Sequence, residues 1–137
     1  MNDGQTNILN LKEMVRSFIE ERDWAKYHNP KDIAISISIE SSELLELFQW
    51  VEDTDVKHLT TDPKKREQMA DELADIVIYC LSLSNSADID LSQAITTKIK
   101  KNIAKYPIDK IKGKYKKYTE IGNEQNSDSP TDGIQKL

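Results

Sequence analysis

Apolar residues recur with a helical period along most of the chain, and they predict four helices. The first is expected from Ile8 to about Lys26, with Asn7 as its N-cap. The second is expected after the connector "YHNPKD", with Asp32 as its cap, and it ends near Val51. The apolar residues of the first helix share one face: Ile8, Leu11, Val15, Phe18 and Ile19.

Helix-start residues predict where the other two helices begin. In "TTDPKKREQM", Asp62 is the expected cap and Pro63 occupies the first helical position, and this helix continues to about Ser86. Asp90 precedes "LSQAITTKIKKNIAKY", a helical segment that stops at Pro107 because proline interrupts helical hydrogen bonding.

The stretch "IAISISI", residues 33–39, alternates apolar and polar side chains, which is typical of a strand. We still expect a helix here. The stretch continues without a turn residue into a segment of helical period, and a single strand would have no partner elsewhere in the chain. The predicted fold class is therefore all-α, with four helices and no sheet.

Length and composition indicate one domain, expected over residues 1–120, followed by a polar and disordered tail over 121–137. No apolar run approaches the roughly 20 residues of a membrane span, and "MNDGQTN" lacks the basic and then apolar pattern of a secretion signal, so none is expected. The single Cys80 is expected to be a core residue in the reducing cytoplasm. A net charge of −5 argues against non-specific nucleic-acid binding, so neither nucleic acid nor membrane is an expected partner.

Two pairs of carboxylates interrupt the apolar faces of the second and third helices. Glu40 falls within the apolar arc of its helix, and Glu43 lies about 60° to one side, at the edge of that arc. Glu72 and Asp75 repeat this arrangement on the third helix. If the two helices pack antiparallel, the four carboxylates meet at one place.

Four carboxylates at one place repel one another unless a cation joins them. Oxygen ligands favour Mg²⁺ or Mn²⁺, and Mg²⁺ in proteins commonly takes substrate phosphates as further ligands. The alternative is that these acids lie on solvated helix faces and pair with lysines, which is common at this spacing. Because both pairs are centred on apolar arcs, we favour the metal site.

The fourth helix places Lys98 and Asn102 on its apolar side. Beside a metal that holds phosphates, Lys98 would act as a positive charge, although lysine stems also extend along apolar surfaces to reach solvent. Aromatic side chains near helix ends or on the acid-bearing flank are candidates for stacking on a base: Trp24, Tyr27, His28, Trp50 and Tyr79.

Several segments in order, "ERDWAKYHNPKD", "ESSELLELFQWVED", "DELADIVIYCLSL", "DLSQAITTKIKKNIAKYP" and "KYTE", resemble the MazG-like all-α NTP pyrophosphohydrolases. The resemblance covers about residues 11–120 and is greatest to the dCTP pyrophosphatase branch. It implies a MazG-like four-helix bundle completed by oligomerisation, as a homodimer or homotetramer. It also implies Mg²⁺-dependent hydrolysis of a (deoxy)nucleoside triphosphate, dCTP or a related one, to monophosphate and pyrophosphate, in cleansing of the nucleotide pool.

The resemblance also assigns roles to individual residues. The metal ligands would be Glu40, Glu43, Glu72 and Asp75, and Lys98 and Asn102 would face the phosphates. Contacts to base and sugar would come from Trp24, Ala25, Lys26, Tyr27, His28, Trp50 and Tyr79. Where the animal dCTP enzymes have a histidine in the first helix, this chain has Val15, so the resemblance leaves the preferred base open.

Two other functions start from the same residues. A di-iron bundle would use Glu-x-x-His on two helices, whereas this chain has Glu-x-x-Glu and Glu-x-x-Asp. A non-catalytic helical nucleotide-binding or oligomerisation module would keep the bundle without the chemistry. The intact set of acids argues against that module, because replacing buried acids with leucine would stabilise a purely structural bundle.

Overall fold

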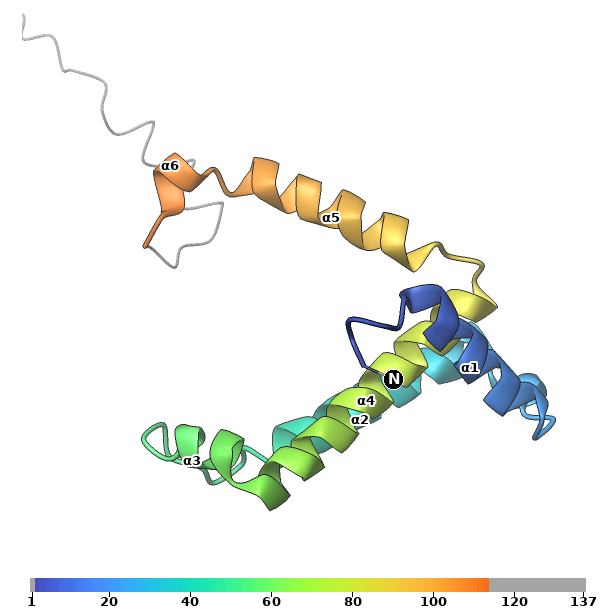
Figure 1. Cartoon of the computed structure of the whole chain (residues 1–137), viewed down its shortest axis with the longest axis horizontal. Helices are drawn as coiled ribbons and strands as arrows, with labels where there is room; N and C mark the ends of the chain where they lie inside the picture. The colour runs from blue at the N-terminus through green and yellow to red at the C-terminus, as the bar shows by residue number, and fades with distance from the viewer. Residues whose placement is uncertain (1, 114–137) are drawn as a thin grey trace, which may run out of the picture. The chain divides into compact units, whose positions relative to one another are not determined.

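The computed structural model describes residues 2–113, and every regular element in this range is helical (Figure 1). The all-α expectation is therefore confirmed. The helices are α1 (Ile8–Glu20), the 3₁₀ turn η1 (Ala25–Tyr27), α2 (Pro30–Glu46), α3 (Val56–Thr61), α4 (Pro63–Ser86), α5 (Leu91–Lys105) and α6 (Ile108–Ile111). The predicted tail, residues 121–137, lies outside the described residues. None of the helices between residues 2 and 113 is apolar over a sufficient length to cross a bilayer.

Two of the predicted N-caps are confirmed. The backbone N–H of Asn10 donates to Asn7 Oδ1 at 2.9 Å, and the backbone N–H of Asn7 donates to Asn10 Oδ1 at 3.4 Å, which completes a reciprocal capping box at the start of α1. At the start of α4, the backbone N–H of Lys65 donates to Asp62 Oδ1 at 2.9 Å, with Pro63 in the first helical position.

The predicted cap of α2 is wrong. Asn29 caps this helix, and the backbone N–H of Asp32 donates to Asn29 Oδ1 at 3.1 Å. The physical reason is Pro30. Proline favours the first helical position, so the cap is the residue directly before it, Asn29. Asp32 lies in the first turn, where hydrogen bonds from Lys31 and then Asn29 lower the pKa of its carboxyl.

Both of the first two long helices end earlier than predicted. α1 ends at Glu20 rather than near Lys26, because Asp23 adopts the left-handed conformation with φ 52°. α2 ends at Glu46 rather than near Val51, and Trp50 in the following turn has φ 75°. The short helices α3 and α6 were not predicted.

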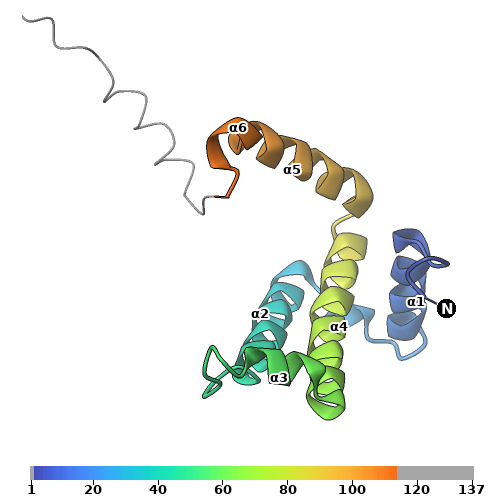
Figure 2. The ribbon, with the colours of Figure 1, turned by 60° about the vertical axis from the view of Figure 1, so that its left-hand side comes forward.

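The described chain falls into two compact units, one up to Ser92 and one from Gln93. In the first unit, α4 packs against α2, α1 and α3. α2 and α4 run in opposite directions (Figure 2). The segment "IAISISI" is helical, and its first residue, Ile33, is only 2% exposed. The other buried apolar side chains of this unit are Val15, Leu59 and Leu81.

Candidate active site

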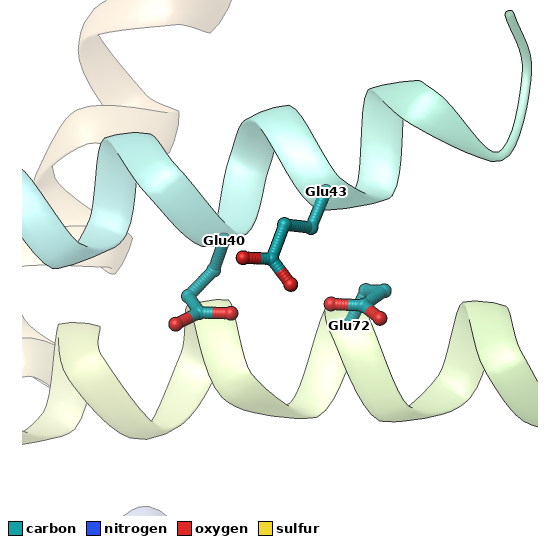
Figure 3. Close-up of side chains that lie close together, drawn as sticks. All are labelled: Glu40, Glu43 and Glu72. Atoms are coloured by element: carbon teal, nitrogen blue, oxygen red, sulfur yellow. The ribbon is translucent and has the colours of Figure 1, made fainter.

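Three carboxylates converge between α2 and α4. Glu40 and Glu43 extend from α2 toward α4, and Glu72 lies on α4 opposite them (Figure 3). One carboxylate oxygen of each lies within 4.8 Å of the other two. Divalent cations bind oxygen ligands at roughly 2.0–2.6 Å, so two ligands of one ion lie up to about 5 Å apart. The three carboxylates therefore fit a single Mg²⁺ or Mn²⁺ ion.

Asp75 lies beside this group rather than within it. It follows Glu72 by one turn of α4 and is exposed. Its oxygens are not among those that lie within 4.8 Å of one another. Its negative charge nevertheless raises the pKa of both Glu40 and Glu72, so it lies within electrostatic reach of the cluster. Three of the four predicted ligands are thus together, and the fourth borders them.

The local environment makes two of these carboxylates hard to ionise. Burial raises the pKa of Glu40, and the charges of Glu43, Asp75 and Glu72 raise it further. Burial and the neighbouring acids, first Glu43 and then Asp75, also raise the pKa of Glu72. Within residues 2–113, no lysine or arginine forms an ion pair with the cluster. The group therefore has unbalanced negative charge, which a divalent cation would neutralise.

The raised pKa values predict how stability depends on pH in the absence of metal. Between about pH 4.3, the ordinary value for glutamate, and the raised values, the folded chain binds more protons than the unfolded chain. Ionisation of Glu40 and Glu72 therefore destabilises the fold above the raised values, and this penalty disappears below the ordinary value.

Urea unfolding in EDTA, from neutral pH downward, measures this effect against the double variant Glu40→Gln/Glu72→Gln. We expect the variant to be the more stable protein at neutral pH, with a difference that shrinks as the pH approaches about 4.3. A variant that is less stable than the natural chain at neutral pH would contradict the inferred repulsion.

A cavity of about 730 Å³ adjoins Asp75, between α4, α1 and the segment that follows α1. Its size is typical of small-molecule sites. Most of the wall is apolar, and the lining residues with polar side-chain atoms are Asp75, Ser82 and three predicted substrate contacts, Trp24, His28 and Tyr79. Trp24 packs edge-on against Phe18 with ring centroids 5.8 Å apart, which fixes the indole at the cavity wall.

The remaining predicted substrate contacts of the first unit lie elsewhere on its surface. Lys26 donates to Asp23 Oδ2 at 2.6 Å, and Tyr27 is 64% exposed. Ala25 lines a smaller neighbouring cavity of about 260 Å³. Trp50 is 93% exposed and does not line either cavity. The roles of these four residues stay predictions.

Lys98 and Asn102 lie on α5, in the second compact unit, and both side chains are exposed. Their expected contacts to phosphates also stay predictions. The two histidines, His28 and His58, are not part of the carboxylate cluster, whose members within the described range are all glutamates. This donor set differs from the Glu-x-x-His ligands of a di-iron bundle.

Sequence reasoning missed other residues that line the cavity, notably Ile78 and Ser82. Ile78 follows Asp75 by three residues, and Ser82 follows Tyr79 by three. Extending the helical wheel from Asp75 and Tyr79 would therefore have found them. Val15, the position at which the sequence motifs depart from the family resemblance, is 8% exposed and lines the same cavity. The departure noted in the sequence therefore changes the wall of this cavity.

Comparison with known proteins identifies the family. The model of the MazG-like family matches residues 35–121, a range that contains all four acids. The chain belongs to the MazG-like family. The resemblance inferred from the sequence motifs is thereby confirmed.

Named relatives of this MazG-like protein include dCTP pyrophosphatase 1 of Mus musculus, which is 32% identical over 117 residues, or 85% of this chain and 69% of the mouse protein. Human dCTP pyrophosphatase 1 is 30% identical with the same coverage. The fold is also similar to the crystal structure of a pyrophosphatase from Archaeoglobus fulgidus, with a TM-score of 0.68 and 37% sequence identity. The match covers 78% of this chain and 98% of the archaeal chain.

Proposed function

We propose that this protein is a Mg²⁺-dependent nucleoside triphosphate pyrophosphohydrolase of the cytoplasm. Its substrate would be a deoxynucleoside triphosphate, dCTP or a related one, and its products the monophosphate and pyrophosphate, in cleansing of the nucleotide pool. The observation that carries the proposal is the convergence of Glu40, Glu43 and Glu72 within 4.8 Å. The adjoining cavity and the pyrophosphatases among the relatives support it.

In this proposal the carboxylates bind the phosphates through a metal ion, and the cavity binds the base. The carboxylates of Glu40, Glu43, Glu72 and Asp75 would hold the metal ion, with Mn²⁺ as a possible substitute for Mg²⁺. When bound, the ion neutralises phosphate charge and lowers the pKa of an attacking water. A carboxylate of the set accepts the proton of that water.

Placing the phosphates at the carboxylates directs the base into the cavity. Asp75 lies within electrostatic reach of the cluster and also lines the cavity, so it would connect the phosphate end of the site with the base end. Trp24 and Tyr79 offer aromatic surfaces to the base. Lys98 and Asn102 are proposed to contact the phosphates, where Lys98 offsets charge that develops during reaction.

We also propose that the chain works as a homodimer or homotetramer. Both helices that carry the acids have exposed apolar side chains spaced four residues apart: Ile35 and Ile39 on α2, and Leu73 and Val77 on α4. Such faces on a helix pair are typical of surfaces that a further helix pair covers in a bundle. The mass in solution, measured by sedimentation, decides this point.

The proposed activity is tested by mixing the purified protein with Mg²⁺ and each of the four deoxynucleoside triphosphates, then separating the products. We expect monophosphate and pyrophosphate in equal amounts, and no reaction when EDTA removes the metal. Diphosphate with orthophosphate would contradict the proposed bond cleavage. Nucleotide binding without hydrolysis would instead support the non-catalytic module.

A further inference from the structure

Ser82 on α4 is a buried polar residue with an unusual environment. The residue is 4% exposed and lines both the large cavity and the smaller one beside it. Among the described residues, 2–113, no side chain or carbonyl hydrogen-bonds its hydroxyl. Ser84, two residues later and 3% exposed, differs because its hydroxyl donates to the carbonyl of Leu81 at 2.9 Å. The Ser82 hydroxyl is therefore available to a ligand in the two cavities that this residue lines.

The position of Ser82 along α4 indicates which part of a nucleotide it meets. Asp75, Tyr79 and Ser82 follow one another at spacings of four and three, and all three line the large cavity. Ser82 lies two turns beyond Asp75, or roughly 10 Å along the helix axis. With the phosphates held at the carboxylates, the far end of this cavity receives the base.

His28 borders the same two cavities and supplies a second polar atom. Its Nδ1 lies 2.9 Å from the carbonyl oxygen of Trp24. A carbonyl only accepts hydrogen bonds, so Nδ1 carries a proton, and a histidine protonated at Nδ1 alone has Nε2 as an acceptor. Val15 contributes only methyl groups to the large cavity. Val15 therefore offers no hydrogen-bonding group to a base in this cavity.

We propose that the Ser82 hydroxyl hydrogen-bonds the edge of the base and is a specificity-determining residue of this enzyme. With His28 it favours a base whose amine at pyrimidine C4 or purine C6 lies beside a ring-nitrogen acceptor, as in cytosine and adenine. The amine donates to His28 Nε2, and the hydroxyl donates to the ring nitrogen. A base with a keto group at that place would set two acceptors against each other. This inference rests on the proposed function.

The test compares kcat and KM of the natural chain and Ser82→Ala for all four deoxynucleoside triphosphates. We expect kcat/KM for dCTP and dATP to fall about five- to tenfold, mainly through KM, because one hydrogen bond remote from the reaction is lost. The values for dTTP and dGTP should stay within about twofold, so the preference for amino bases shrinks. Ser82→Thr, which keeps the hydroxyl, should retain the preference, and Ser84→Ala should leave all four values unchanged.

A substrate analogue separates recognition from packing. 3-Deaza-dCTP lacks the ring nitrogen, so the natural chain and Ser82→Ala should hydrolyse it equally well. Melting temperatures should match for these two proteins, because the hydroxyl has no partner within the described chain. Equal losses on all four nucleotides, or an unchanged preference in Ser82→Ala, would overturn the inference. If the natural chain hydrolyses no nucleotide, the proposed function fails, and binding of non-hydrolysable analogues then tests Ser82 by the same comparison.

Discussion

Glu72→Gln is expected to lower kcat about a thousandfold, because the substitution keeps the shape of the side chain and removes its negative charge. Glu72 is one of the three carboxylates that converge between α2 and α4, and it has the position on α4 that faces α2. Glu40→Gln should have an effect of similar size, since Glu40 is the half-buried member of the cluster on the opposite helix. Initial rates with saturating Mg²⁺ and dCTP measure both.

The matched control for this prediction is Glu67→Gln. Glu67 lies on the same helix, is exposed, and is not part of the cluster. Its substitution should leave kcat within about twofold, because an exposed surface change seldom exceeds 0.5 kcal/mol in effect. Loss of activity in Glu72→Gln should not reflect unfolding, because removing one of several repelling charges favours the metal-free fold. Comparable rates for Glu67→Gln and Glu72→Gln would contradict the assignment.

Ile33→Ala is expected to lower the free energy of unfolding by about 2–5 kcal/mol. Ile33 is 2% exposed in the first turn of α2, the helix that packs against α4, so its truncation leaves a cavity. The loss is a large fraction of the roughly 5–15 kcal/mol that stabilises an ordinary domain. Activity should fall with stability, because α2 carries Glu40 and Glu43 into the cluster.

Urea unfolding of the metal-free protein measures the effect of Ile33→Ala. Ile35→Ala is the control: the side chain is the same and lies on the same helix, but it is 52% exposed in the single chain. Under dilute conditions that favour the single chain, its cost should stay below about 1 kcal/mol. A cost below about 1 kcal/mol for Ile33→Ala would contradict the inferred core.

The helices and the acid cluster could be predicted because both depend on local spacing. Apolar period and the caps Asn7 and Asp62 identified the starts of α1 and α4. The same period placed Glu40 and Glu72 on apolar arcs, and both are half-buried in the structure. Once α2 and α4 pack antiparallel, the convergence of the cluster follows from helical geometry.

The features that were missed depend on backbone conformation or on distant parts of the chain. Asp23 and Trp50 adopt positive φ. The spacing of apolar residues does not indicate such a backbone conformation, so the predicted ends of α1 and α2 were too late. Ser82 could not be identified as a candidate site residue from the sequence, because it lines a cavity that residues of α1 and α4 form together. The helical wheel of α5 placed Lys98 on the apolar side of the helix, yet its side chain is exposed. A helical wheel gives the order of residues around a helix but does not show which other elements cover them.

The most direct measurement of the metal site is an anomalous difference map from crystals of this protein grown with Mn²⁺. We expect a peak between α2 and α4, with carboxylate oxygens of Glu40, Glu43 and Glu72 bound to it. The peak should be absent or much weaker in Glu72→Gln crystals grown in the same solution. No peak at this place in the natural chain, with the three carboxylates turned away from one another into solvent, would contradict the proposed metal centre.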